Sequence, residues 1–163
     1  MKTLCIFLAG LVLLAGCAKE EVVEPINTTP PPSRNVPLSS YDRSKISVKG
    51  NTIEVYVADE RAERADGLMF VKDNELGADE GMVFVFAAAE QLSFWMENTL
   101  IPLDIAFLDK DGKILNILQM KALDPTPQPS AGPAQYAVEM HVGWFDKKGI
   151  KAGDKFDLGG ISQ

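Results

Sequence analysis

Apolar and polar residues alternate with a period of two on either side of a short turn in the first half of the chain. Residues 46–48 read Ile-Ser-Val and residues 53–57 read Ile-Glu-Val-Tyr-Val, and Lys49-Gly50-Asn51 lies between them. Successive side chains on a β-strand point to opposite faces, and a Gly-containing turn between two alternating runs is typical of a hairpin. The pattern therefore predicts a β-hairpin over residues 46–57.

A short helix is expected directly after this hairpin. Asp59 is a good N-cap residue, Glu60 and Glu63 fall in the first turn, and Gly67 stands where a helix commonly ends. Acidic residues stabilise a helix N-terminus, and glycine adopts the backbone conformation that closes a helix. These signals predict a helix over residues 60–66.

The rest of the chain reads as further short strands. Residues 82–86 are apolar throughout, which is typical of a strand that is covered on both faces. The other expected elements are strands at 94–96, 103–108, 113–120, 136–142 and 155–158, turns at 87–91 and 109–112, a Pro-rich loop at 124–133 and one helical turn at 143–148. Roughly seven to nine strands with one short helix predict a mainly β fold, a single-domain β-sandwich or small barrel.

The first 16 residues resemble a lipoprotein signal peptide. Lys2 precedes the apolar run Leu4–Ala15, which is shorter than the roughly 20 residues that a membrane-spanning helix needs. Small residues stand immediately before Cys17, as lipoprotein signal peptidase requires. We expect cleavage before Cys17 and acylation of this residue, for example by palmitate, because two or more acyl chains anchor a protein stably to a membrane.

Residues 17–44 are expected to form a tether between this anchor and the folded domain at residues 45–163. The stretch contains five prolines and no apolar periodicity, although its last few residues could also dock as an edge strand. The anchor places the protein in the cell envelope. Since Ala18 rather than Asp follows the cysteine, we expect an outer-membrane location facing the periplasm in a Gram-negative cell.

Composition excludes several classes of site. Cys5 belongs to the signal peptide and Cys17 to the anchor, and His141 is the one histidine, so thiol nucleophiles, disulfides and multi-histidine zinc sites are not expected. We expect no metal and no cofactor. The net charge of −7 argues against nucleic acid as a partner.

Several spaced motifs resemble the uncharacterised family called domain of unknown function 192. They are Gly67-Leu68-Met69, Gly81-Met82, Trp95-Met96, Asn98-Thr99 and Pro102-Leu103-Asp104-Ile105, followed by Glu139, Gly143, Gly149-Ile150 and Gly153-Asp154. The resemblance covers roughly residues 48–158. It implies a compact, mainly β domain, often secreted or lipid-anchored, without an established activity.

Asp104 is the most informative charged residue, because it stands within an apolar strand. Burying an unpaired carboxylate costs several kcal/mol, so the residue must be paired, hydrogen-bonded or placed in a cleft. One interpretation is a structural ion pair with Arg64 or Arg61. The other is an acid–base pair with Glu139, which would make Asp104 and Glu139 weak catalytic candidates.

Trp95, Asn98 and Thr99 are candidates for a ligand site. Asn98 and Thr99 favour a tight turn, but they could also donate hydrogen bonds at the mouth of a pocket with Trp95 as its wall. The candidate binding residues are therefore Trp95, Asn98, Thr99, Asp104 and Arg64. The scattered methionines are expected to fill the core rather than to bind copper.

Three functional hypotheses follow from these observations. The first is a non-catalytic binding or adaptor module for a small or glycan-like ligand, anchored to the membrane through the lipid on Cys17. The second is an envelope hydrolase that uses Asp104 and Glu139. The third is a structural or assembly partner of another envelope protein, with no pocket. The enzyme question stays open, and a non-catalytic role is favoured.

Overall fold

Seven strands form one mixed sheet in the order β5-β4-β6-β3-β2-β1-β7 in the computed structural model, which describes residues 33–161. Neighbouring strands are antiparallel except for the parallel pair β2 and β3. The strands are β1 (Asp42–Val48), β2 (Asn51–Ala58), β3 (Glu80–Phe94), β4 (Leu103–Leu108), β5 (Ile114–Met120), β6 (Gln128–His141) and β7 (Phe156–Asp157). The helices are α1 (Arg61–Asp66) and α2 (Trp144–Lys147), with 3-10 turns η1 (Leu38–Ser40) and η2 (Asp73–Glu75).

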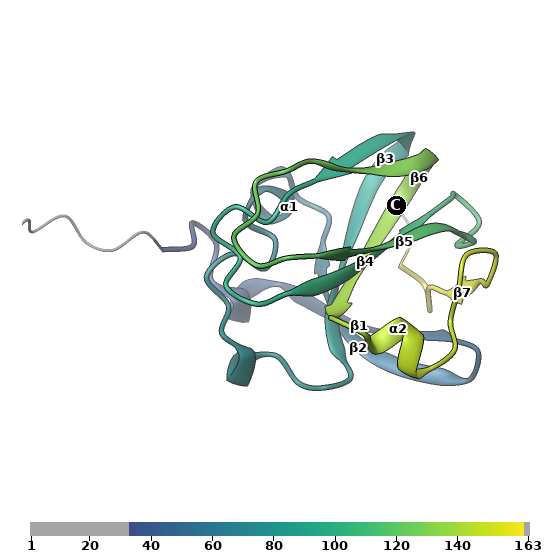
Figure 1. Ribbon diagram of the computed structural model, residues 1–163, viewed down its shortest axis with the longest axis horizontal. Coiled ribbons are helices and arrows are strands. Elements are labelled where there is room, and N and C mark those ends of the chain that lie inside the picture. Colours follow the sequence, from purple (N-terminus) through teal and green to yellow (C-terminus); the bar gives the residue numbers. More distant parts are fainter. Residues whose placement is uncertain (1–32, 162–163) are drawn as a thin grey trace, which may run out of the picture. The chain divides into compact units, whose positions relative to one another are not determined.

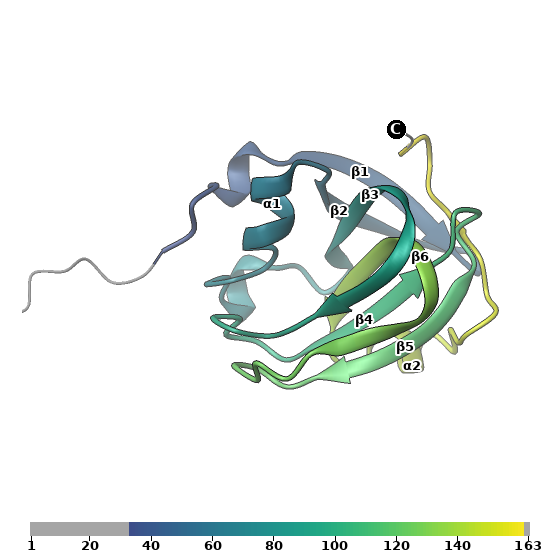
Figure 2. The ribbon, with the colours of Figure 1, turned by 90° about the horizontal axis from the view of Figure 1, so that it is seen from above.

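The sheet curls on itself, so that its two edges approach each other (Figures 1 and 2). An isolated bridge joins Lys113 to Lys155, and the N–H of Phe156 donates to the carbonyl of Gly112 at 2.9 Å. The architecture is a half-barrel made from one sheet. The predicted mainly β, single-domain class is confirmed, and the small barrel describes it better than the sandwich.

The first hairpin forms as the alternation predicts. Lys49 and Gly50 connect β1 to β2, and both have positive φ, 49° and 76°. A two-residue loop with both residues in this conformation matches the right-handed twist of the flanking strands. Its geometry fixes the register that turns Ile46 and Ile53 toward the same core.

Helix α1 lies on the crossover that the parallel pair β2 and β3 requires. The N-cap is Glu60, one residue later than expected, and the Glu63 carboxylate accepts the N–H groups of Glu60 and Asp59 at 3.2 and 3.3 Å. Gly67, with φ 47°, ends the helix. None of the helices within residues 33–161 has the length and apolar character needed to cross a membrane.

The expected turn at 87–91 is wrong, and the Pro-rich loop expected at 124–133 is confirmed only for residues 124–127. Strand β3 continues for 15 residues and β6 for 14, and the two pair out to Phe94 and Gln128 with register shifts along the way. Prolines lack an N–H donor and normally interrupt a sheet. Here the Ser130 hydroxyl accepts the Leu92 N–H at 3.1 Å, so a side chain supplies a contact that the proline-containing backbone lacks.

Both faces of the central strands are buried. One cluster fills the inside of the curled sheet, where Trp144 and Phe145 of α2 pack against β-strand valines and isoleucines. The other cluster covers the outer face and includes side chains from the loops around Leu68 and Met96. Double burial explains the apolar run at 82–86. Met82, Met96, Met120 and Met140 are core residues, as expected.

The N-terminal segment joins the fold earlier than expected. Strand β1 begins at Asp42, and the Asp66 carboxylate accepts hydrogen bonds from the Val36 N–H and the Asn35 amide, both at 2.7 Å. Residues 33–44 therefore pack against the folded unit, and their last three residues belong to β1, which lies between β2 and β7 rather than at an edge of the sheet. The signal peptide, Cys17 and the first half of the expected tether lie outside the described residues.

Candidate functional site

A hollow of about 310 Å³ lies between α1, strand β3 and the C-terminal end of β6. Of the residues proposed from the sequence, it brings together Arg64, Trp95, Thr99 and Glu139. We call it the Glu139 pocket. Asp104 and Asn98 do not line it.

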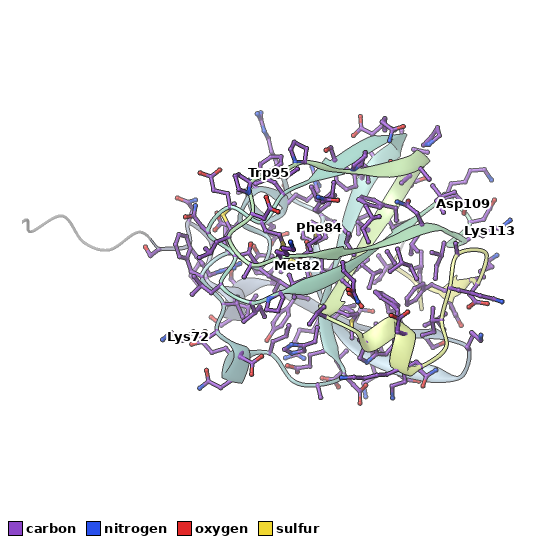
Figure 3. The ribbon with its side chains drawn as sticks, viewed as in Figure 1. Lys72, Met82, Phe84, Trp95, Asp109 and Lys113 are labelled. Atoms are coloured by element: carbon purple, nitrogen blue, oxygen red, sulfur yellow. The ribbon has the colours of Figure 1, made fainter. Side chains whose placement is uncertain are left out.

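The walls of the Glu139 pocket are aromatic. Phe84, Phe86 and Phe94 come from the same long strand, and the ring of Phe94 meets those of Phe84 and Phe86 edge-on at centroid distances of 4.8 and 6.4 Å. Trp95 stands at the mouth with 49% of its surface exposed. Figure 3 shows Trp95 near the edge of the molecule and Phe84 deeper inside. Such a lining favours a ligand with an apolar or planar body.

Glu139 is one of three buried polar residues that line the pocket, together with Asp66 and Thr99. Strand pairing places it beside Met82 and Ile105, on the outer face of the sheet, and only 4% of its surface is exposed. Burial raises the pKa of Glu139 to about 8, and no donor or cation from residues 33–161 offsets this cost. At pH 7 the side chain is therefore mainly a neutral acid, able to donate a hydrogen bond into the pocket.

Two arginines of α1 contribute positive charge. Arg64 Nη1 donates to the carbonyl oxygens of Val85, at 3.0 Å, and Asp59, and its guanidinium lies 5.2 Å from the centroid of the Phe86 ring. These contacts fix Arg64 as part of the wall. Arg61 also lines the pocket and is exposed, so it remains available to an anionic group at the mouth.

Asp104 has a structural position, and none of its three expected partners, Arg61, Arg64 and Glu139, is bonded to it among the described residues. Its Oδ2 accepts the Gly143 N–H at 2.8 Å, at the start of α2. Burial raises the pKa of Asp104, and the Gly143 hydrogen bond opposes this rise. Strand pairing sets Ile105, not Asp104, opposite Glu139. Asp104 and Glu139 therefore face opposite sides of the sheet and do not form a catalytic pair.

Replacing Asp104 with alanine is expected to destabilise the protein by about 2 kcal/mol. The change leaves the partly buried N–H of Gly143 without its acceptor, and loss of a partner by a buried group costs about 1–3 kcal/mol. Asp104→Asn keeps an acceptor oxygen and should cost less than half as much. Urea unfolding of the two variants measures the difference. Equal losses in both would contradict an acceptor role for Asp104.

Asn98 and Thr99 form the turn that the sequence favoured. Asn98 has φ 60°, and the Thr99 N–H donates to the carbonyl of Met96 at 3.0 Å, the arrangement of a turn that needs Gly or Asn at its third position. The Asn98 carbonyl accepts the Phe70 N–H at 2.9 Å. The turn thus holds Trp95 and Thr99 against the loop that follows α1, and Thr99 alone of the pair reaches the pocket.

A second, more polar hollow of about 530 Å³ contains His141. The imidazole Nε2 lies 3.1 Å from the Leu76 carbonyl oxygen, and Asp79 accepts the Trp144 indole N–H at 2.9 Å. The main polar side chains of this second hollow therefore already have hydrogen-bond partners within the protein, whereas Glu139 has none among the described residues. Among the described residues, no three His, Cys, Asp or Glu side chains gather as metal ligands would.

The family pattern of DUF192, described as Uncharacterized ACR, matches residues 44–158. The chain belongs to the DUF192 family. The segments that carried the resemblance from sequence contribute Gly67-Leu68-Met69, Trp95, Thr99 and Glu139 to the pocket lining. Part of the set of motif residues therefore converges on the Glu139 pocket from distant parts of the sequence, whereas Gly81, Asp104 and Gly143 of the same set lie outside its lining.

Two solved structures share the fold with a TM-score of 0.68 each. A protein of unknown function from Novosphingobium aromaticivorans is 37% identical, and the match covers 75% of this chain and 89% of that one. A proposed transcription regulator from Sinorhizobium meliloti is 28% identical, with 72% and 95% covered. No match was found among functionally curated proteins.

Proposed function

We propose that this DUF192 protein is a lipid-anchored binding module of the cell envelope, whose Glu139 pocket takes a small ligand. The supporting observation is Glu139 itself. A carboxyl that is 4% exposed and lacks a partner within the described residues costs stability, and such groups are concentrated at functional sites. A ligand atom that accepts the Glu139 proton would remove the cost.

The pocket lining sets the ligand class. Four aromatic side chains suit a compact apolar or planar body, and the neutral Glu139 acid suits a carbonyl or other acceptor at its inner end. The exposed Arg61 suits an anionic group at the outer end. A cavity of about 310 Å³ lies at the lower end of the range for small-molecule sites. A small, largely aromatic pocket fits such a molecule better than an extended glycan.

The other hypotheses have less support. The hydrolase hypothesis needs Asp104 and Glu139 on one side of the sheet, and they lie on opposite sides. The hypothesis of a structural partner without a pocket has less support, because a hollow of about 310 Å³ lies beside Glu139. Regulation of transcription, suggested by the description of the Sinorhizobium protein, fits poorly with a net charge of −7, since nucleic acid is bound mainly through positive charge. The expected anchor on Cys17 would hold the module at the outer membrane, facing the periplasm in a Gram-negative cell.

Binding of 8-anilinonaphthalene-1-sulfonate tests the pocket, because this dye combines an aromatic body with an anionic group. We expect one dye per chain. Ser93→Phe places a ring into the pocket and should weaken dye binding at least tenfold, while Arg61→Ala should weaken it about two- to fivefold through loss of one exposed charge. Fluorescence titration measures both effects.

Thr52→Phe is the matched control, since it adds the same ring at an exposed position of β2 outside the pocket. It should leave dye binding unchanged. If the native protein does not bind the dye, or if Ser93→Phe binds it as tightly as the native chain, the proposed pocket is wrong.

A further inference from the structure

Exposed large apolar side chains gather on two adjacent loops. Within residues 33–161 the most exposed ones are Trp95 (49%), Leu100 (44%), Leu123 (59%) and Val142 (38%). The first three lie on loops that are joined by hydrogen bonds, from the Leu123 N–H to the Thr99 carbonyl at 3.0 Å and from the Met96 N–H to the Asp124 carbonyl at 2.8 Å. We call Trp95, Leu100 and Leu123 the Trp95 face.

The backbone holds this face in a costly conformation. Leu123 has φ 60°, and Phe70 and Asn98 on the neighbouring loops have φ 61° and 60°. The left-handed conformation costs a residue with a Cβ roughly 1–2 kcal/mol, and a leucine adopts it rarely. Leu123 therefore combines backbone strain with an apolar side chain exposed to water. Strain of this kind is concentrated at functional sites.

We propose that the Trp95 face rests on the surface of a lipid bilayer. Tryptophan favours the interface between water and lipid, and leucines beside it insert into the acyl boundary. The mouth of the Glu139 pocket, where Trp95 stands, then opens next to the bilayer. This inference rests on the membrane anchor of the proposed function and not on the identity of the pocket ligand.

The point where the chain enters the fold supports this orientation. Arg34 Nη1 donates to the carbonyls of Gly67 and Met69, both at 2.8 Å, and the next residue along that loop, Phe70, donates to Asn98. The N-terminal segment is thus fastened to the loops that carry the Trp95 face. In Figure 3 Trp95 lies in the half of the molecule where the described chain starts, and Asp109 and Lys113 lie at the opposite end.

Because the expected tether holds the domain near the membrane, a weak contact between the Trp95 face and the bilayer is enough to orient it. Fifteen residues lie between Cys17 and Ser33, a span of at most about 55 Å when fully extended. The tether keeps the effective concentration of this surface near the bilayer high. Three side chains can therefore dock on the lipid even if the free domain, without its anchor, has no measurable affinity for vesicles. The net charge of −7 and the exposed Glu97 favour a neutral lipid surface over an anionic one.

Tryptophan fluorescence tests the proposal, because the chain has two tryptophans and Trp144 is 5% exposed. Residues 17–163 would be coupled through Cys17, the one cysteine of this stretch, to a maleimide lipid in phosphatidylcholine vesicles, some with brominated acyl chains. This chain retains the whole folded unit, and chemical coupling makes the result independent of natural acylation and of any ligand. On vesicles we expect the fluorescence emission of Trp95 to shift to shorter wavelength. Brominated acyl chains should quench its intensity at least twofold, and both effects should be absent in Trp95→Phe.

Leu100→Asn with Leu123→Asn should abolish most of the bromine quenching without lowering the unfolding midpoint, since asparagine accepts the left-handed conformation. Val142→Asn is the matched control, because Val142 is exposed but lines the other hollow, and quenching should persist. The proposal is overturned if Trp95 is quenched by aqueous acrylamide equally on vesicles and in solution, with no effect of bromine. Quenching that persists in the double leucine variant would also overturn it.

Discussion

Replacing Glu139 with glutamine is expected to raise the free energy of unfolding by about 3 kcal/mol at pH 7. Glutamine has nearly the same shape as glutamate and can still donate a hydrogen bond into the pocket, but it cannot ionise. The native carboxyl must either ionise in a buried site or keep a proton that the unfolded chain would release at this pH. Both the buried charge and the retained proton lower the free energy of unfolding, and the uncharged glutamine of the variant has neither cost.

The sign of the pH dependence follows from the two pKa values. Burial raises the pKa of Glu139 from an ordinary value of 4.5 to about 8 in the folded protein. Between these values the folded state binds more protons than the unfolded state, so stability is lost as pH rises. The contribution is fully present below pH 4.5 and fully lost above pH 8. At 1.36 kcal/mol per unit, the whole loss is about 5 kcal/mol.

Urea unfolding of native protein and Glu139→Gln at pH 5, 6, 7 and 8 measures the effect. The difference between the two should widen steadily across this range, while the shifts of all other groups cancel in the comparison. Glu90→Gln, at an exposed position of β3, serves as control and should change the free energy of unfolding by less than about 0.5 kcal/mol. If the curves of native protein and Glu139→Gln run parallel from pH 5 to 8, Glu139 is not a buried neutral acid.

Local patterns predicted much of the fold. Alternation located β4 at residues 103–108. The turn residues located the first hairpin and the turn at 109–112, and the strand expected after that turn covers all of β5. In that turn the Asp109 carboxylate accepts the N–H groups of Asp111 and Lys113, which is a contact within five residues. Features of this kind depend on neighbouring residues, so the sequence contains the information that specifies them.

The outer ends of β3 and β6 could not be predicted in this way. Residues 87–91 and the prolines near Pro129 and Pro133 look like breakers when each segment is read alone. They become strands because the two segments pair with each other and Ser130 supplies an acceptor for Leu92. This contact spans 38 residues, and neither segment signals it.

The same error hid part of the site. Because a turn was expected at 87–91, Phe94 was assigned to a different strand from Phe84 and Phe86, and the sequence did not predict that the three rings line one pocket wall. Both carboxylates were recognisable because apolar residues surround them, but alternation within one strand does not tell which face becomes which side of the core. The pairing of β4 with β6 decides that Asp104 points to α2 and Glu139 to the pocket.

Gly81→Ala is expected to lower the free energy of unfolding by at least about 3 kcal/mol, the upper end of the usual cost of overpacking. Gly81 pairs with Met140 in the centre of the sheet, and a Cβ there would overlap the carbonyl oxygen of Glu139 and the sulfur of Met140. The thioether could move, but the carbonyl belongs to β6, which is held between β3 and β4 with both faces buried.

Gly132→Ala is the control for Gly81→Ala, because a Cβ at Gly132 meets nothing within 4 Å. It should be neutral or slightly stabilising, through the smaller conformational freedom of alanine in the unfolded chain. Urea unfolding compares the two, and equal midpoints would contradict the close approach at Gly81. Because the displaced carbonyl is that of Glu139, a surviving Gly81→Ala protein should also bind the dye less tightly than the native chain. The glycine would then act on the pocket through the backbone of β6, with no atom of its own in the site.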